Sequence, residues 1–373
     1  MPNYNDLRPE ADFRERDYAL VFPGMTLVEK RRCIEGLLRL KMGLGSLVPP
    51  RRTEANLLIA SWNIVRFGAS KQRLPESYYY LAEIIAAFDL VAVQEVRTSL
   101  RELELVMRIL GSDWRYMVND VTGGPAGNHE RSAYIYNTRR VELSGLAAEI
   151  ALWKEMRGPG ALIEQIQRAP FVTGFRAGWK DFAMVNLHLQ PGDGRRDVEL
   201  RMEEVRLLLA ALDHKAREVW TENLVLVGDM NLYFDADIPT VAAIEAAGFR
   251  ENDGAKGIPT NVGGTEAYDR MFFREGEYFS FETAEGREIG GVFDLFGFVF
   301  RDEDWPVYRA EMAADHGTPA RAAAIPHDDA LAESYYRNPW RKNQISDHLP
   351  VWVELRSDDS AKFLSGNLGA LGS

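Results

Sequence analysis

Four short apolar runs along this chain each lead directly into side chains that bind metal ions or phosphate. The runs span residues 57–61, 90–93, 182–187 and 224–227, and the polar residues that follow them are Asn63, Glu95, His188, Asp229 and Asn231. Each run is mostly apolar and free of proline, which is typical of a buried strand whose polar end opens at the edge of a sheet. The pattern therefore favours a strand-rich core with these polar ends in one place.

A further acid and imidazole stand near the C-terminus. Residues 344–351 read QISDHLPV, which sets Asp347 and His348 just before a stretch that alternates like a strand. Singly, such signals are weak, because an Asp-x-Asn after a strand is usually a turn whose side chains bond the local backbone. Five strand ends that point the same way would instead gather these acids, amides and histidines in one cleft.

Together and in this order, the motifs resemble the endonuclease/exonuclease/phosphatase superfamily, whose fold is that of deoxyribonuclease I. The resemblance covers residues 56–355. It implies an α/β fold, a four-layer α/β sandwich of two packed mixed β-sheets flanked by helices. Helical periodicity at residues 78–88 and 199–212, between the strand runs, also favours such a sandwich.

Two more carboxylates extend the resemblance to the nuclease branch. In the deoxyribonuclease I family each catalytic histidine is held by an acid from another strand, and Glu130 and Asp269 match the positions of those acids. Such a carboxylate fixes the tautomer of the imidazole and raises its basicity. The alternative for both acids is a surface ion pair with a neighbouring arginine. Arg97, in Gln-Glu-Val-Arg, resembles the family's arginine that reaches the nucleic-acid backbone or groove.

The resemblance also implies how the site works. Glu95 is the expected metal ligand, with Asn63 beside it and Asp347 as a further contributor. Oxygen ligands without cysteine suit Mg²⁺, with Mn²⁺ as the alternative. His188 would bind the phosphate or protonate the leaving group, and Asn231 would orient the attacked phosphate.

The identity of the general base stays open at this point. Either Asp229 or His348, the latter held by Asp269, would position and deprotonate the attacking water, since members of the superfamily are interpreted both ways. The abasic-site branch is disfavoured, because it usually has an acid where this chain has Val65 and a tyrosine where it has His188.

The predicted function is a metal-dependent phosphodiesterase, most readily an endonuclease with DNA favoured over RNA as the partner. The main rival is a phosphatase or phosphodiesterase that acts on a small-molecule or lipid phosphate, of the inositol phosphate or sphingomyelin type. A non-catalytic binding module that kept the fold is a second rival. The full set of acids, amides and histidines counts against that second rival, because an inactive site would be expected to lose some of them.

Composition sets bounds on the partner. The chain has 373 residues, 46% of them hydrophobic, and a formal net charge of -12. That charge argues against a protein that coats nucleic acid by bulk electrostatics, although local basic groups can still hold a polyanion. The candidate groups near the motifs, about half of which we expect to be solvated rim residues, are Arg66, Arg97, Arg131, Arg195, Arg196, Arg341 and Lys342.

The single cysteine and the N-terminal sequence predict a location. Cys33 has no partner for an intramolecular disulfide, which fits a reducing compartment. Residues 1–18 are charged and lack the apolar segment of a signal peptide, and no apolar stretch is long enough to span a membrane. We therefore expect a cytoplasmic protein without membrane association, whose oligomeric state the sequence does not specify.

Three regions are predicted. Residues 1–55 form an N-terminal helical extension and linker, with one amphipathic helix at 26–42; residues 56–356 form the catalytic domain; residues 357–373 form a flexible tail. An insertion at about 309–343 carries three aromatic residues that would either stack on a base or fold onto a small core of their own: Tyr335, Tyr336 and Trp340. Four other histidines are assigned to the surface or to structure: His129, His214, His316 and His327.

Overall fold

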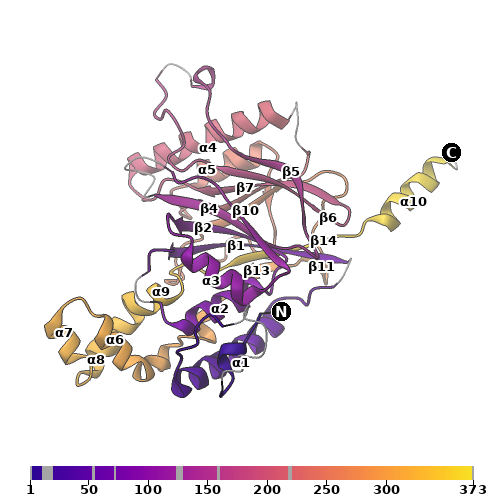
Figure 1. The fold of residues 1–373 in the computed structure, drawn as a ribbon. Helices are drawn as coiled ribbons and strands as arrows, with labels where there is room; N and C mark the ends of the chain where they lie inside the picture. Colours follow the sequence, from indigo (N-terminus) through magenta and orange to yellow (C-terminus); the bar gives the residue numbers. More distant parts are fainter. Residues whose placement is uncertain are drawn as a thin grey trace.

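Two six-stranded sheets form the body of the molecule in the computed structural model, which describes residues 2–10, 20–52, 55–70, 73–122, 129–157, 160–216 and 221–371 (Figure 1). The first sheet has the order β13-β14-β1-β2-β4-β3, built in that order from Gly290–Val292, Val351–Arg356, Asn56–Phe67, Leu90–Arg97, Glu130–Asn137 and Trp114–Val118. The second has the order β5-β6-β7-β8-β10-β9, built from Glu142–Glu149, Phe171–Ala177, Lys180–His188, Leu224–Asp229, Asp269–Arg274 and Arg250–Glu251.

Each sheet is mixed in the same way. One parallel pair lies inside each sheet, β1 with β2 and β7 with β8, and the other neighbours are antiparallel. Within each sheet, the C-terminal ends of the parallel pair therefore share an edge with the N-terminal ends of their antiparallel neighbours β4, β10 and β14. The predicted fold class is confirmed, and this edge collects the polar residues that the sequence placed at strand ends.

Three hydrophobic clusters correspond to the layers of the sandwich. The cluster between the sheets takes Leu57 and Ile59 from β1, whereas Leu58 and Trp62 of the same strand point to the opposite face. That alternation has the period of two that a strand requires. Helices α1 (Leu27–Leu47), α2 (Pro75–Ile85) and α3 (Arg101–Leu110) cover the outer face of the first sheet, and α4 (Arg195–Ala216) and α5 (Ile238–Ala246) cover the second (Figure 1).

The N-terminal helix α1 is part of the core and is longer than the predicted segment 26–42. It begins with a capping box in which the Thr26 side chain and Glu29 satisfy each other's backbone N–H groups. Gly36, which weakens the helix pattern in the sequence, has a packing reason. A Cβ atom there would lie 2.2 Å from the hydroxyl oxygen of Tyr80, so only glycine allows α1 to approach α2 this closely.

The region of the predicted insertion is helical, and its run of helices begins before residue 309. It runs through η5 (Asp302–Tyr308), α6 (Arg309–Asp315), α7 (Pro319–Ala324), α8 (Asp329–Tyr335), η6 (Tyr336–Trp340) and α9 (Arg341–Gln344), and α6 to α8 project beyond the sandwich (Figure 1). Tyr336 and Trp340 are buried with Tyr308 and Phe300. Base stacking by Tyr336 and Trp340 is therefore excluded in this conformation, because both rings build the core of the insertion.

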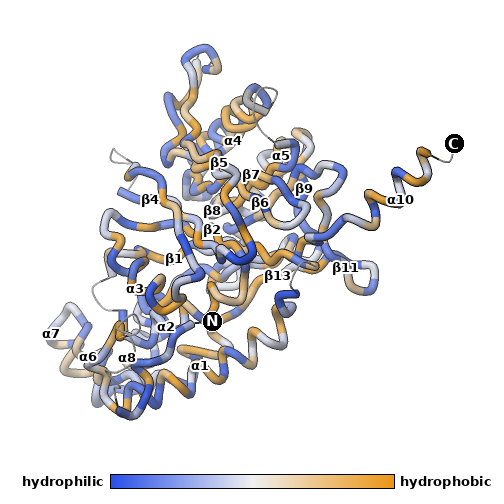
Figure 2. Tube along the Cα trace, turned by 45° about the vertical axis from the view of Figure 1, so that its right-hand side comes forward, coloured by the Kyte–Doolittle hydropathy of each residue, from blue (hydrophilic) through white to orange (hydrophobic). Residues whose placement is uncertain are grey.

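The C-terminal segment 357–373 contains a helix, α10 (Ser360–Leu371), where the sequence suggested a flexible tail. Its first turn is held by the buried ion pair of Asp359 with Lys180 and by Phe363, which packs on Trp179. Beyond that turn the helix stands apart from the body, with hydrophobic residues along it (Figures 1 and 2). None of the described helices is long and apolar enough to cross a membrane.

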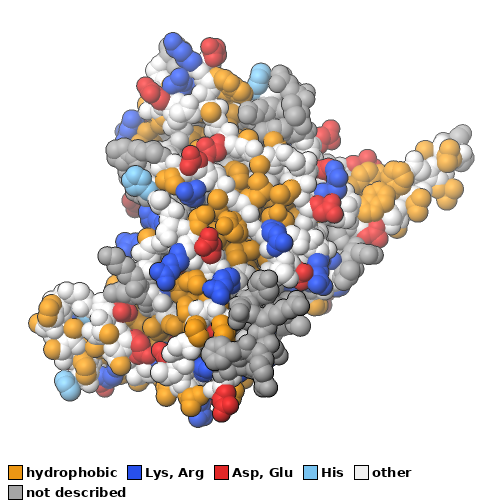
Figure 3. All heavy atoms as spheres, in the orientation of Figure 1, with side chains coloured by type: hydrophobic (Ala, Val, Ile, Leu, Met, Phe, Trp, Pro, Cys, Tyr) orange, Lys and Arg blue, Asp and Glu red, His pale blue; other side chains and the backbone are white. Residues whose placement is uncertain are grey.

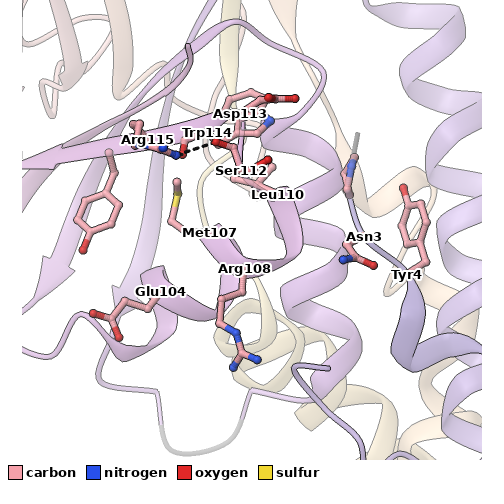
Figure 4. Close-up of a pocket in the computed structure, with 13 residues that line it drawn as sticks. Asn3, Tyr4, Glu104, Met107, Arg108, Leu110, Ser112, Asp113, Trp114 and Arg115 are labelled. Atoms are coloured by element: carbon pink, nitrogen blue, oxygen red, sulfur yellow. Dashed lines mark hydrogen bonds between the residues drawn. The ribbon is translucent and has the colours of Figure 1, made fainter. Parts of the chain in front are cut away.

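A cavity of about 1130 Å³ lies between the N-terminal segment, α3 and the edge strand β3 (Figure 4). Its lining includes Tyr4, Met107 and Trp114. Trp114 pairs with Asn137 at the end of β4, whereas Glu130 is at the beginning of that strand. The cavity therefore lies toward the opposite end of the first sheet from the polar cluster described below.

Gly228 in β8 offers a test of how tightly the second sheet is packed. It has a φ of 137°, and a Cβ atom there would lie 2.1 Å from the carbonyl oxygen of Leu187 in β7. We expect Gly228→Ala to lower the free energy of unfolding by about 2–4 kcal/mol. Gly145→Ala is the control, because Gly145 has a φ of 98° but open space around it; it should cost only about 1–2 kcal/mol. If chemical denaturation showed that the two variants lose the same free energy of unfolding, the steric argument would be contradicted.

Candidate active site

The carboxylate of Asp229, at the end of β8, lies at the centre of the polar cluster. Asn63 Nδ2 in β1 donates a hydrogen bond of 2.9 Å to Asp229 Oδ2. The Nε2 atoms of His188 and His348 lie 3.4 Å and 3.9 Å from the same oxygen. The backbone N–H of Asn231 donates to Asp229 Oδ1 at 3.0 Å. One buried carboxylate thus contacts residues from both sheets.

Asp269, the first residue of β10, contacts His348 on the side of the ring opposite to Asp229. His348 Nδ1 lies 2.7 Å from Asp269 Oδ2, which leaves Nε2 directed to the Asp229 side. Asp269 is paired in register with Asp229 across β10 and β8. Thr260 connects the start of β10 to the segment that carries His348. Its Oγ1 accepts a hydrogen bond from the N–H of Asp269, and its carbonyl accepts one from the N–H of Leu349.

His188 has a carboxylate partner of its own in Glu130. His188 Nδ1 and Glu130 Oε2 are 3.1 Å apart, in an orientation that does not meet hydrogen-bond geometry, so we treat the contact as electrostatic. Glu130 is further held by Arg168, whose Nε donates to Oε2 at 2.8 Å, and by Arg97, whose Nη2 lies 3.1 Å from Oε1. Glu130 is therefore surrounded by three basic side chains.

These contacts set the charge states of the acids. Burial alone would raise the pKa of Glu130, but His188, Arg168 and Arg97 outweigh it and lower that pKa to about 2. Burial likewise opposes ionisation of Asp229, yet the neighbouring histidines and the Asn63 hydrogen bond lower its pKa. Both acids therefore carry negative charge at neutral pH.

His348 and Asp269 form a more strongly interacting pair. Burial disfavours the charged ring of His348, but Asp269 and Asp229 outweigh this and raise the pKa of His348 well above its usual value. Burial is also the largest influence on Asp269, and together with the charge of Asp229 it raises the pKa of Asp269. The pKa of His348 is raised because two carboxylates face its ring and stabilise the positive charge.

Glu95 is aimed into the cluster by an irregularity in β2. The pairing of β2 with β4 shifts register between Val93 and Val96, and Glu95 has a φ of 59°, which is unusual for a residue other than glycine. The backbone N–H of Arg66 donates to Glu95 Oε2 at 2.9 Å. Strand β1 also continues past Asn63 to Phe67 instead of ending there as predicted, with its own register shift against β2.

Asn63 and Glu95 provide oxygens that suit a hard divalent cation. Asn63 Nδ2 is committed to Asp229 and lies 3.4 Å from Glu95 Oε1, while the buried Asn63 Oδ1 has no hydrogen-bond partner. An unpaired buried carbonyl oxygen, on a side chain that neighbours a carboxylate, fits a cation that prefers oxygen ligands. Asp347 is half-buried, and its side chain makes no hydrogen bond or ion pair with either residue in the described structure.

A metal cage made only of charged side chains is not present in the part of the chain that the structure describes. No group there of three or more His, Cys, Asp or Glu side chains is arranged to hold an ion. A site with one or two protein carboxylates is nevertheless the usual arrangement for Mg²⁺, which keeps several water ligands. Glu95 with the Asn63 amide is compatible with that arrangement.

The basic candidates divide into three kinds. Arg97 lies between the two acids of the cluster, with Nη2 3.6 Å from Glu95 Oε2 as well as close to Glu130. Arg195 pairs with Glu199 on the exposed start of α4, as a rim residue would. Arg341 is buried and pairs with Asp302 of the insertion, so its role in the described structure is to hold the insertion together. The remaining candidates are Arg66, Arg131, Arg196 and Lys342.

The four remaining histidines lie away from these contacts. His214 packs on Trp153, and His316 packs on Tyr335. His129 and His327 are exposed. None of the contacts of Asp229, Glu130 or Asp269 described above involves them.

Sequence reasoning missed the residues that hold the cluster in place. Arg73 is buried and donates to the carbonyl oxygens of Gln344, Ile345 and Val65 at 3.1, 3.0 and 2.7 Å, and it pairs with Glu102. It thereby joins the loop before Asp347 to the end of β1. Arg168 was missed as well. Both arginines follow no recognisable motif, so only the folded chain reveals their contacts.

Arg73 provides a test of this bracing. We expect Arg73→Met to lower the free energy of unfolding by about 3–5 kcal/mol, because Glu102 keeps a buried charge without its partner. Any catalytic activity of the site, per folded molecule, should fall too, because the loop that carries His348 loses its anchor. Lys180→Met is the matched control, since it breaks the buried pair with Asp359 at the start of β7, far from His188. Equal activity of the two folded variants would refute a positioning role.

Comparisons with known proteins agree with this arrangement. No family model matches the chain. Deoxyribonuclease-1 of Homo sapiens is 27% identical over 184 residues, which cover 47% of this chain and 61% of that protein. Deoxyribonuclease gamma of Mus musculus is 26% identical over 184 residues, which cover 47% and 55%. The chain thus spans somewhat over half the length of these curated relatives.

Among solved structures, the humanized D. rerio TDP2 carrying 14 mutations has a TM-score of 0.49 and 14% identity, covering 80% of this chain and 98% of that one. The sequence matches to the deoxyribonucleases, the two mixed sheets and the cluster around Asp229 agree with one another. The chain is therefore a distant sequence relative of deoxyribonuclease I, and its fold and polar cluster resemble those of the endonuclease/exonuclease/phosphatase superfamily.

Proposed function

We propose that this phosphodiesterase is a Mg²⁺-dependent endonuclease that hydrolyses nucleic acid, with DNA favoured over RNA. The observation that carries the proposal is the position of two imidazoles, each with its own carboxylate, whose Nε2 atoms lie 3.4 Å and 3.9 Å from the same oxygen, Asp229 Oδ2. Phosphodiester hydrolysis needs an activated water in line with the phosphorus and a proton for the leaving oxygen. A pair of oriented histidines beside an ionised acid meets both needs.

Asp229 takes the proton of the attacking water in this proposal, with His348 beside it. Their facing atoms, Asp229 Oδ2 and His348 Nε2, are 3.9 Å apart, and the raised pKa of His348 leaves its ring charged, so the proton goes to Asp229. Asp269 holds the opposite nitrogen of His348 at 2.7 Å and stabilises the charged ring. The two candidates for the base thus work as one unit in which Asp229 is the proton acceptor.

His188 and Asn231 act on the phosphate and the leaving group. Glu130 holds His188 Nδ1 on one side, so Nε2 is the atom that gives a proton to the departing oxygen. One N–H of the Asn231 side chain donates to the carbonyl of Leu189 at 3.1 Å, and its second N–H is left for a phosphate oxygen.

Glu95 and Asn63, with Asp347 as a further ligand, would hold the cation. When bound, Mg²⁺ or Mn²⁺ neutralises charge on the phosphate oxygens. Asn63 serves two purposes in this arrangement, since its amide nitrogen orients Asp229 and its oxygen is left for the ion.

Nucleic acid is the favoured substrate because the sequence relatives are named deoxyribonucleases. The rival, a small-molecule or lipid phosphoesterase, is favoured by the net charge of -12 and by the interspersed positive and negative side chains on the face in Figure 3. The cytoplasmic location remains a proposal that rests on the single cysteine, which is buried.

Glu95→Gln is the direct test of metal-dependent cleavage. Supercoiled plasmid, single-stranded DNA and RNA are incubated with Mg²⁺, beside phosphomonoesters and inositol phosphates. We expect nicking that EDTA abolishes and that Glu95→Gln lowers by about 100-fold or more. Glu282→Gln is the control, since Glu282 is as buried as Glu95, with side-chain exposures of 17% and 18%, but lies near the other end of β14. Release of phosphate from the small molecules alone would favour the rival.

A double-mutant cycle tests whether Glu130 acts through His188. Glu130→Gln and His188→Ala should each lower kcat by about 10²–10⁴-fold. The double variant should be no slower than His188→Ala alone within about threefold, because a carboxylate that only orients the ring has nothing left to orient. Single-turnover cleavage of one labelled oligonucleotide measures all four proteins. Losses that multiply would show that Glu130 has an independent role.

A further inference from the structure

A second cavity, of about 420 Å³, lies beside the candidate active site on the side of the insertion. One wall is the segment around Asn261 and Val262, and the other is formed by Phe296, Arg301 and Arg341. Its volume lies within the range of about 300–1,000 Å³ that is usual for ligand pockets. The insertion therefore does more than extend the surface, because it helps to enclose space next to the site.

The cavity and the site share a wall. Asn261 forms a β-bridge with His348, and the N–H of Val262 donates to the carbonyl of Asp347 at 3.0 Å. Leu349, the next residue, lines the cavity directly. A substrate whose phosphate lies at His348 therefore has the cavity as its neighbour, because the next residue of the backbone, Leu349, forms part of the cavity wall.

The lining is polar but is not suited to phosphate. Arg341 is held by Asp302, and Arg301 lies 2.7 Å from Glu303, so both guanidinium groups already have acid partners. Asp294 adds a further exposed carboxylate to the lining, which leaves an excess of acid over base. A second phosphate would meet like charge here.

The same groups suit a nucleobase. Arginine and aspartate in fixed pairs offer planar donors and acceptors of the kind that read base edges. Arg341 lies over Phe296, with its guanidinium carbon 4.8 Å from the centre of the ring. The exposed carboxylate of Asp302, at 56% side-chain exposure, is an acceptor that solvent or a base can reach.

We propose that this cavity, shaped by the insertion, is a subsite for one nucleoside next to the scissile phosphate, which seats the base out of its stack. The proposal rests on the nuclease function proposed above and specifies its substrate class. A base that enters a side pocket must leave its stack, which costs least in single-stranded or frayed nucleic acid. The subsite therefore makes single-stranded or unpaired substrate the preferred class.

Gly297 allows the cavity to be filled without disturbing its walls. It lines the cavity, is exposed, and would have no heavy atom within 4 Å of an added Cβ. Gly297→Trp should occupy the space that the base needs, and Gly297→Ala should not. Gly317, in the insertion, also has open space around it and does not line the cavity, so Gly317→Trp is a matched control.

Three chromogenic diesters separate the subsite from the chemistry. Methyl p-nitrophenyl phosphate has no nucleoside, and the 3′- and 5′-p-nitrophenyl phosphates of thymidine carry one on either side of the phosphate. We expect Gly297→Trp to lower kcat/KM for one thymidine ester, relative to the methyl ester, by about 5- to 100-fold, the value of one well-seated base. Gly297→Ala and Gly317→Trp should leave that ratio unchanged, and circular dichroism verifies that each variant is folded.

The outcomes differ for the subsite and for the proposed function. An unchanged ratio in folded Gly297→Trp would overturn the subsite, as would an equal fall on all three diesters. Preference of the wild-type protein for duplex over single-stranded DNA would also count against it. Failure of the wild-type protein to cleave either thymidine ester or any nucleic acid, with phosphate release from inositol phosphates, would instead refute the nuclease function itself.

Discussion

A buried negative charge at the end of β8 dominates the organisation of this molecule. Asp229 is 2% exposed, and an ionised carboxylate removed from water is stable only with partners that replace its hydration. The partners come from both sheets, with Asn63 from β1 and His188 from β7. The edge where the two sheets meet is therefore held together by the same contacts that make the site.

Each histidine that contacts Asp229 depends in turn on a carboxylate partner of its own, farther into the fold. His348 needs Asp269, and Asp269 needs its place opposite Asp229 in β10. His188 needs Glu130, whose negative charge is compensated by Arg97 and Arg168. Each group around the site thus compensates the buried charge of the group that it contacts. This also explains why the strand ends carry polar groups although the strands themselves are apolar.

The sequence predicted the parts of the site that follow from strand order, and it failed where contacts depend on three-dimensional paths. Runs of apolar residues that end in Asn63, Glu95 and His188 predicted a common edge, because strand polarity alone brings such ends together. The bulge that aims Glu95 was not predicted, since its φ of 59° has no sequence signature. Arg73 and Arg168 were missed for a related reason, because their partners lie far away in sequence and belong to no motif.

The charges around Asp229 show why the site calls for a cation. Five carboxylates gather in this region, those of Glu95, Glu130, Asp229, Asp269 and Asp347, against the guanidinium groups of Arg97 and Arg168 and the rings of His188 and His348. The acids remain in excess even when both rings are protonated. A phosphodiester that approaches this edge meets net negative charge, so it is repelled unless a positive ion shares the site. Arginine cannot fill that need here, because both guanidinium groups are already engaged with Glu130. Asn63, whose side-chain oxygen has no hydrogen-bond partner and whose amide nitrogen lies 3.4 Å from Glu95 Oε1, is the position where an added cation would reverse the balance.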